Sequence, residues 1–332
     1  MIYNMNNYAM NQYNENCRLQ NASILKFYPK ILEALRLSGQ VTRIADYGCS
    51  EGQNSLLLFR NLISDHREHS KTPVEVSHVD LPSNDWNAFT KAMQKESYLS
   101  FSDTSLSIVP GSFYEKLFLE GSIDFGFASF AFHYLDTPIP AEDSVYVDLS
   151  LDPQVQESLA SLASQSISKI LSSRIAELRS EGVLCIIHPE FDSSKLDTIR
   201  VLQKARESLK QDLSVEILKN YTIQGTVVNE QLWKTEIAKF PELELVEMER
   251  VSFVPPFYED YLKEGDLEKY ARTYAGWLEA WALPPLRRCI SHLGETEISE
   301  ILEKFDFYLR SAITEDLQPN YFSSSIIILK KR

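Results

Sequence analysis

The chain has few cysteines, and they form no recognisable motif. Only four occur among its 332 residues, and no two have Cys-x-x-Cys spacing: they are Cys17, Cys49, Cys185 and Cys289. Cysteines this far apart favour neither a zinc site nor a disulfide framework. We therefore expect reduced thiols and a cytoplasmic protein.

Long apolar runs are also missing. The longest largely apolar stretch, around Phe125–Phe132, is far shorter than the roughly 20 residues that a membrane-spanning helix needs. The amino-terminal residues Met1–Tyr8 are polar and lack the apolar core of a secretion signal. We expect no membrane segment and no export.

Positive charge is scarce as well. The chain carries 33 Lys and Arg against 47 Asp and Glu, a formal net charge of −14. Sequence-independent binding of nucleic acid depends on a surface of Lys and Arg that neutralises phosphates, so a nucleic-acid partner is not expected. A small-molecule substrate is favoured. The hydrophobic content of 44% is enough for one large α/β domain, or for a core with a smaller cap.

Residues 42–55 are the most informative stretch that is present. A short apolar strand leads into Asp46, and Gly48 and Gly52 interrupt the backbone before the apolar helix that begins near Leu56. Residues without a Cβ let the backbone approach a ligand, and this order is typical of a nucleoside-cofactor site at the carboxyl end of a parallel sheet. The alternative is an ordinary strand-to-helix turn, because short glycine motifs are weak evidence.

The spacing of the loop favours one cofactor over another. Gly48-x-x-x-Gly52 differs from the G-x-G-x-x-G pattern that holds a pyrophosphate at a helix amino terminus. The carboxylate of Asp46 would repel a phosphate and would suit an ammonium group. S-adenosylmethionine (SAM) carries an ammonium, a carboxylate, a sulfonium and an adenosine but no phosphate, so the loop fits SAM better than a dinucleotide.

The remaining patterns predict a doubly covered sheet. A second strand over Val74–Asp80 ends on Asp80, an acid placed to accept hydrogen bonds from ribose hydroxyls. A strand over Ile123–Ser129 is apolar enough to be buried on both faces. Further strands are expected at 106–109, 183–187, 243–251 and 325–329, and helices at 22–37, 55–65 and 156–179, the last ending at Glu181-Gly182.

Strands that alternate with helices indicate an α/β fold with an open, mostly parallel sheet, whose ligand lies beyond the carboxyl ends of the strands. The segment from about 196 to 295 is richer in Tyr, Trp and paired prolines and has mainly helical patterns. We expect a core formed by 1–195, 240–252 and 296–332, and a mainly helical cap formed by 196–239 and 253–295.

Four sequence blocks, in order, carry a family resemblance. They are Tyr13–Gln20, Ile44–Ser55, Asp80–Asn87 and Pro110–Phe118, and the carboxyl half adds a weaker match at Glu279–Pro284. The chain resembles the SABATH family of SAM-dependent methyltransferases, which methylate salicylic, benzoic, jasmonic and indole-acetic acids and the xanthine precursors of caffeine. The resemblance implies a Rossmann-like class I methyltransferase sheet, a homodimer, and SAM as methyl donor with S-adenosylhomocysteine (SAH) as product.

The resemblance also implies site residues. Asp46 and Asn54 would bind the amino-acid end of SAM, with Cys17 near its carboxylate. Gln20 and Tyr134 would grip the acceptor's carboxylate, although tryptophan is usual at the place of Tyr134. The implied cofactor residues are Tyr13, Cys17, Asp46, Gly48, Asn54, Asp80, Leu81, Ser112, Phe113 and Ser129, and the implied acceptor residues are Tyr13, Gln20, Phe130, His133 and Tyr134.

The expected reaction is esterification of a small, hydrophobic or aromatic carboxylic acid. Because an acid with a pKa near 4 is already ionised at neutral pH, no catalytic base is needed, and catalysis rests on proximity and orientation. His133 would shape the acceptor pocket, and His188 would be structural. The alternatives are N-methylation of a heteroaromatic or amine within the same family, and a non-catalytic protein with a SAM fold.

Two further expectations concern a metal and the cap. Residues 141–145 lack the Asn-Lys-Gly motif that accompanies a metal-associated cluster in some family members, so no functional metal is expected. Most of the cap aromatics are expected to pack in its core: Trp233, Phe253, Tyr258, Trp277 and Trp281.

Overall fold

The computed structural model describes residues 10, 12–96, 98–190, 197–226, 228–315, 317 and 321–332. Its centre is one seven-stranded sheet in the order β3-β2-β1-β4-β5-β7-β6, in which β7 runs antiparallel to both neighbours and the first five strands pair in parallel. The strands are β1 (Arg43–Tyr47), β2 (Val74–Asp80), β3 (Thr104–Pro110), β4 (Ile123–Ser129), β5 (Leu178–Glu190), β6 (Leu243–Phe253) and β7 (Phe322–Lys331). The predicted mostly parallel α/β sheet is confirmed.

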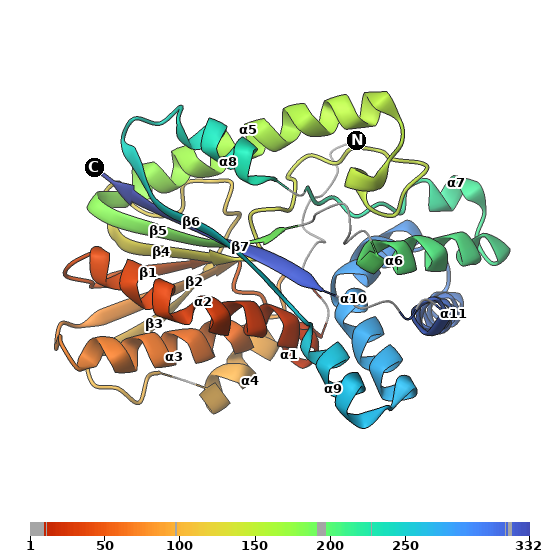
Figure 1. The fold of residues 1–332 in the computed structure, drawn as a ribbon, viewed down its shortest axis with the longest axis horizontal. Coiled ribbons are helices and arrows are strands. Elements are labelled where there is room, and N and C mark those ends of the chain that lie inside the picture. The colour runs from red at the N-terminus through yellow and green to blue at the C-terminus, as the bar shows by residue number, and fades with distance from the viewer. Residues whose placement is uncertain are drawn as a thin grey trace.

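Helices cover both faces of the sheet (Figure 1). On one face lie α2 (Arg18–Leu37), α3 (Gln53–Arg67) and α4 (Trp86–Glu96), preceded by the short α1 (Tyr13–Asn16); on the other lie α5 (Pro153–Glu177) and α8 (Glu230–Ile237). Because apolar side chains from both layers meet the sheet, β4 is buried along nearly its whole length, as its sequence predicts.

One predicted boundary differs, because the strand after the long helix begins earlier than expected. The sequence pattern predicts a helix over 156–179 and a strand from 183, whereas α5 ends at Glu177 and β5 begins at Leu178. Arg179 then turns to the base of the sheet, where its guanidinium pairs with Asp124. Asp124 also accepts hydrogen bonds from the backbone N–H groups of Thr42 and Arg43 at 2.7 and 2.8 Å. These tertiary bonds hold Arg179 in the sheet directly after the helix.

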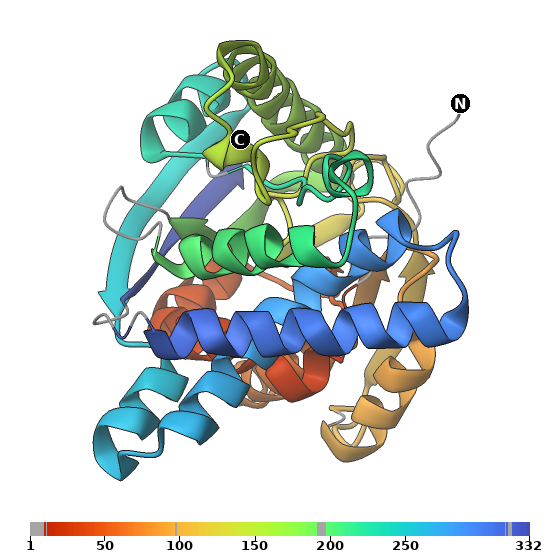
Figure 2. The ribbon, with the colours of Figure 1, turned by 90° about the vertical axis from the view of Figure 1, so that its right-hand side faces the viewer.

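A helical layer lies beyond the carboxyl ends of the parallel strands (Figures 1 and 2). It contains α6 (Asp197–Ser208), α7 (Val215–Leu218), α9 (Pro256–Glu264), α10 (Leu267–Cys289) and α11 (Glu295–Glu315), and α11 packs on α6 and α10. Among the described helices, none combines the length and apolarity needed to cross a bilayer.

The placement of two helices bears on the expected division into core and cap. Helix α8, expected in the cap, packs on α5, where Glu236 accepts hydrogen bonds from the hydroxyls of Ser164 and Ser168. Helix α11, expected in the core, belongs to the helical layer. The division remains a proposal, with α8 in the core and α11 in the cap; its boundary near residue 195 and the segment Met1–Tyr8 lie outside the described residues.

Candidate cofactor and acceptor site

A cavity of about 350 Å³ lies where β1, β2 and β3 end, at the edge predicted for the ligand. Its volume falls within the range of roughly 300–1,000 Å³ typical of small-molecule sites. Five of the predicted cofactor residues line it, namely Gly48, Asp80, Leu81, Ser112 and Phe113. The other five do not: Tyr13, Cys17, Asp46, Asn54 and Ser129 are absent from its wall.

Gly48 shapes this wall by letting two loops approach each other. Its φ of +88° lies in the left-handed region, and a Cβ placed on it would stand 2.4 Å from the Cβ of Ala131. Ala131, in the loop after β4, also lines the cavity. Glycine is therefore required at position 48 both for its backbone conformation and for packing between the loops.

Asp80 stands in the cavity wall at the end of β2. Its Oδ2 accepts a hydrogen bond from the backbone N–H of Ser50 at 2.6 Å, and its Oδ1 accepts one from Leu81 at 2.7 Å. Burial raises the pKa of Asp80 to about 6. Each carboxylate oxygen can accept a second hydrogen bond, so both remain available to a ribose hydroxyl.

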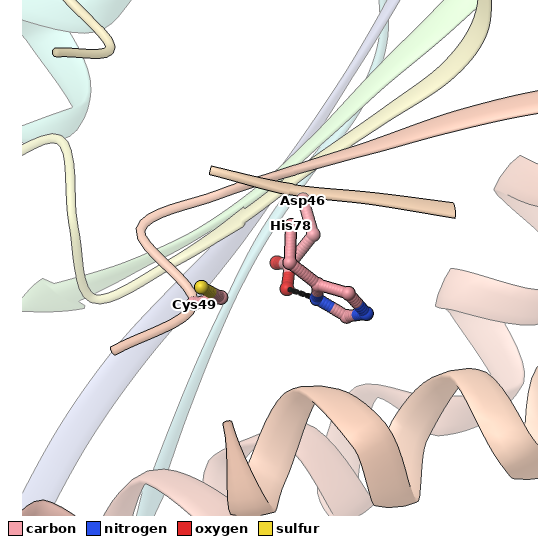
Figure 3. A group of neighbouring side chains, drawn as sticks. All are labelled: Asp46, Cys49 and His78. Carbon is pink, nitrogen blue, oxygen red and sulfur yellow. Dashed lines mark hydrogen bonds and ion pairs between the residues drawn. The ribbon is translucent and has the colours of Figure 1, made fainter. Parts of the chain in front are cut away.

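Asp46 is held inside the protein by His78 (Figure 3). The Oδ2 of Asp46 lies 2.8 Å from the Nδ1 of His78, whose Nε2 lies 2.9 Å from the hydroxyl of Tyr98. Asp46 and His78 are 2% and 0% exposed. The carboxylate that the sequence assigns to the ammonium of SAM thus has a protein partner, and its contact with the cofactor stays a prediction.

Cys49 lies beside this pair, so three potential metal-ligand atoms fall within 4.8 Å of one another (Figure 3). The thiol of Cys49 donates to the backbone carbonyl of Ser50 at 3.5 Å. Burial raises the pKa of Cys49 well above its ordinary value, and both ring nitrogens of His78 already have partners in Asp46 and Tyr98. The group is best explained as a packed, hydrogen-bonded part of the interior.

Asn54 and Cys17 fasten the amino-terminal helices to the glycine loop. Asn54 donates to the hydroxyl of Tyr13 at 3.3 Å and to the backbone carbonyl of Cys17 at 3.1 Å, while its Oδ1 accepts from Asn21 at 3.2 Å. Asn14 adds bonds to Glu51 and to the backbone N–H of residue 53. The Asn-rich motif therefore joins two chain segments, and direct contacts of Tyr13, Cys17 and Asn54 with SAM remain predictions.

The loop after β3 forms the opposite wall. Ser112 and Phe113 line the cavity, and the Phe113 ring packs against Phe132 with 5.2 Å between centroids. Tyr114 donates from its hydroxyl to the backbone carbonyl of Tyr134 at 2.7 Å, which ties this loop to the predicted acceptor segment. Ser129, at the end of β4, keeps a buried Oγ with no partner among the described residues.

A second, smaller cavity of about 40 Å³ adjoins the first and shares Phe130 and Tyr134 with it. Gln20 and His133 also line it, so four of the five predicted acceptor residues come together. Tyr13, the fifth, does not line it. Gln20 is 5% exposed, and its Oε1 is buried without a partner among the described residues.

His133 is a neutral imidazole in this cavity. Burial, and secondarily the neighbouring ring of His188, hold the pKa of His133 well below its ordinary value. Its Nδ1 has no partner among the described residues. His188 lies 6.0 Å from it between ring centroids and donates from Nδ1 to the backbone carbonyl of Pro189 at 2.7 Å. A neutral His133 suits a positioning role.

The sequence did not indicate part of the wall of the second cavity. Trp277 belongs to the hydrophobic core and Trp281 packs against it, as expected, but both also line this cavity, together with Met10, Tyr146, Pro189 and Phe322. Both tryptophans lie on α10, one helical turn apart, so they share a face. The four-residue spacing was a possible signal, but it could not show that this face points to the end of β4.

The fold and the cavities together define the class of protein. An open sheet with a glycine loop after β1 and an acid after β2 forms an α/β nucleoside-cofactor site. The sequence model of SAM-dependent carboxyl methyltransferases matches residues 3–331. The chain belongs to this family, SABATH, and its cofactor is SAM.

Individual relatives agree with this assignment. The chain is 27% identical to a salicylate/benzoate carboxyl methyltransferase of Arabidopsis thaliana, with 90% of this chain and 85% of the relative covered. It is 23% identical to a probable caffeine synthase of Coffea canephora, covering 87% and 84%. A solved loganic acid methyltransferase with SAH has a TM-score of 0.75 over 96% of each chain at 18% identity, which shows the common fold.

Proposed function

We propose that the protein esterifies a small carboxylic acid with the methyl group of SAM. The observation that carries the proposal is the second cavity, where Gln20, His133 and Tyr134 meet beside the cofactor cavity. These neutral side chains can donate hydrogen bonds to a carboxylate without transferring a proton to it. The aromatic lining favours a hydrophobic or ring-bearing acid.

The cofactor cavity is proposed to hold SAM along its whole length. Asp80 and Leu81 would hold ribose and adenine, and Ser112 and Phe113 would face the adenine. Gly48 would let the backbone approach the methionine end. Two features of the cavity support SAM as its ligand. Asp80 stands in the wall, where it can bind ribose. Lys169, which also lines the cavity, is paired with Asp136 at 2.6 Å and is therefore not free to bind a phosphate.

The protein contributes to the reaction by orienting the acceptor and by excluding water from the site. Bound SAM supplies a methyl group on a positively charged sulfur. Gln20 and Tyr134 would orient one carboxylate oxygen toward this methyl group, and the aromatic wall would exclude water. Holding the reactants in near-attack geometry is worth about 7–11 kcal/mol of the barrier, so no general base is required.

One observation favours the alternative of N-methylation. The Oε1 of Gln20 is buried without a partner, and an N–H group on a heteroaromatic acceptor would satisfy it. Since an amide can also turn its NH₂ toward the acceptor, Gln20 serves either reaction. The two reactions therefore need a direct test.

The test is methyl transfer from isotopically labelled SAM to a panel of acids and heteroaromatic amines. A base-labile product supports the ester, and a base-stable product counts against it. Gln20→Glu sharpens the test, because the new carboxylate repels an anionic acceptor and should raise its KM more than tenfold, by about 1.4 kcal/mol or more. Gln40→Glu, an exposed residue near the amino end of β1, is the matched control.

The proposal includes a homodimer acting in the cytoplasm, and no metal requirement. Light scattering on the purified protein tests the dimer, and its expected mass is twice 38.1 kDa. Activity that survives a chelator supports the metal-free reaction, whereas activity that is lost and then restored by a divalent cation contradicts it.

A further inference from the structure

A buried ion pair on α5 lies behind the loop that walls the cofactor cavity. Arg174 and Glu177 are 1% and 0% exposed, and the guanidinium Nε stands 2.9 Å from Oε2 of the carboxylate, without hydrogen-bond alignment. Nη2 of Arg174 also donates to Oε1 of Glu177 at 3.0 Å. Neither residue lines a described cavity, so any effect on the cofactor must pass through other residues.

Arg174 holds the first half of the loop through its backbone. Its Nη1 donates to the carbonyl oxygen of Phe113 at 2.8 Å, and its Nη2 donates to that of Glu115 at 2.7 Å. The planar guanidinium is suited to this fork, because its donors are fixed relative to one another. Phe113 and Glu115 both line the cofactor cavity.

Glu177 holds the second half of the loop and also bonds to the end of β1. Its Oε1 accepts hydrogen bonds from the backbone N–H groups of Leu117 and Phe118, the latter at 3.1 Å. Its Oε2 accepts from the hydroxyl of Tyr47 at 2.7 Å. Tyr47 is the last residue of β1, directly before Gly48, and its ring lies 4.1 Å from the guanidinium carbon of Arg174.

Stability alone is a poor explanation for this arrangement. A buried ion pair loses so much hydration that apolar residues of the same volume are often as stabilising. Apolar residues could not bind four backbone groups of one irregular loop and a side chain at the end of β1. What the pair adds is a fixed distance between the loop after β3 and the loop after β1, the two walls of the cofactor cavity.

We infer that Arg174 and Glu177 are positioning residues, which set the affinity for the cofactor by holding the 113–118 loop against the adenosine end of the cavity. The inference rests on the proposed function insofar as Ser112 and Phe113 face the adenine. Since the pair binds the backbone of this loop directly, its removal should weaken every ligand that carries adenosine. The acceptor site, which the loop reaches through Tyr114 and its bond to Tyr134, should change less.

The test is calorimetric binding of SAH and of 5′-methylthioadenosine, which has the adenosine but lacks the amino-acid end. Glu177→Gln removes the charge at nearly constant shape and should weaken both ligands by the same factor, about tenfold or more, as expected for a hydrogen bond to a charged group. Arg174→Lys keeps the charge but loses the fork, and should lose affinity as well. Tyr47→Phe removes one hydroxyl and should lose about threefold.

Arg60→Met is the matched control. It breaks an ion pair of 2.8 Å between α3 and α4 whose side chains are 40% and 34% exposed. It should bind both ligands like the unmodified protein. KM for SAM should rise by a larger factor than the acceptor KM in Glu177→Gln, a division that general loosening of the fold would not produce.

Two results would overturn the inference. One is SAH affinity within twofold of the unmodified protein in every variant that folds among Glu177→Gln, Arg174→Lys and Tyr47→Phe. The other is loss of SAH affinity without loss of 5′-methylthioadenosine affinity. Failure of the proposed function gives a separate result, because it concerns the methylated product and leaves SAH binding to the unmodified protein intact.

Discussion

Replacing Gly48 with alanine tests how the two loops of the cofactor cavity pack. The added Cβ would stand 2.4 Å from that of Ala131, and the residue would have to keep a φ of +88°. Gly265 offers a matched control, because it has a φ of +71° at the end of α9 and a Cβ there would meet nothing within 4 Å. Gly265→Ala therefore measures the backbone strain alone.

The expected losses of stability follow from the strain of a left-handed residue and from the overlap of the two Cβ atoms. A left-handed alanine costs about 1–2 kcal/mol, and both variants bear this cost. Carbon atoms pack at roughly 3.5–4.0 Å, so the overlap at Gly48 must be relieved by moving the loops apart by about 1 Å. Overpacking of this kind costs about 1–3 kcal/mol more. At about 2 °C per kcal/mol for a chain of this size, Gly48→Ala should melt about 4–10 °C lower and Gly265→Ala about 2–4 °C lower.

Ala131→Gly in the Gly48→Ala background separates the two terms. It removes the opposing Cβ, so the double variant should recover the overpacking cost and retain the strain. Differential scanning calorimetry measures stability, and isothermal titration with SAH measures whether the widened wall weakens binding. If Gly48→Ala melts no lower than Gly265→Ala, or if Ala131→Gly restores nothing, the close approach does not constrain these loops.

Three further predictions concern single side chains. Because burial raises the pKa of Asp80 to about 6, SAH affinity should fall as the pH drops through about 6. In Asp80→Asn, SAH affinity should be low and independent of pH. Protonation of Asp80 also removes the cost of burying its charge, so this group does not destabilise the fold at acid pH. Since the pKa of His133 is held well below its ordinary value, kcat should be constant between about pH 6 and 8. A change of kcat with pH in this range that disappears in His133→Asn would contradict the neutral state of His133. Trp281→Ala should enlarge the acceptor cavity and lower the KM for bulkier acids several-fold without changing the KM for SAM. Leu262 on α9 is 63% exposed, and Leu262→Ala should change neither KM.

The sheet was predictable because its signals are local. Strands such as Ile123–Ser129 are continuous apolar runs, and the loop at Gly48 marks where a strand gives way to a helix. The start of β5 at Leu178 was not predictable from a local pattern, since Arg179 is held there by Asp124, 55 positions away. The positions of α8 and α11 likewise depend on packing partners that periodicity does not identify.

The motifs predict which residues gather near the cofactor cavity, but they do not predict which of them line its wall. Asp80, Ser112 and Phe113 line the cavity as the motifs imply. Asn54 and Cys17 come from motifs of the same strength, yet their polar atoms are used to join α2 to α3. A motif records that residues are needed together, and it does not distinguish a ligand contact from a bond between two segments that form the site.

The acceptor cavity shows why the methyl acceptor is harder to infer than the cofactor. The cofactor wall comes from loops at the ends of adjacent parallel strands, so the topology brings its residues together whatever the cap does. The acceptor wall joins Gln20 on α2, the segment after β4, Trp277 and Trp281 on α10, and Phe322 at the start of β7. Its volume of about 40 Å³ is small beside the 350 Å³ of the adjoining cavity, so an acid bound there would extend toward the cofactor or displace aromatic side chains. If the second cavity holds the acceptor, as we propose, acceptor choice depends on how α10 packs against the core, and we expect substitutions on α10 to change it without altering the cofactor site.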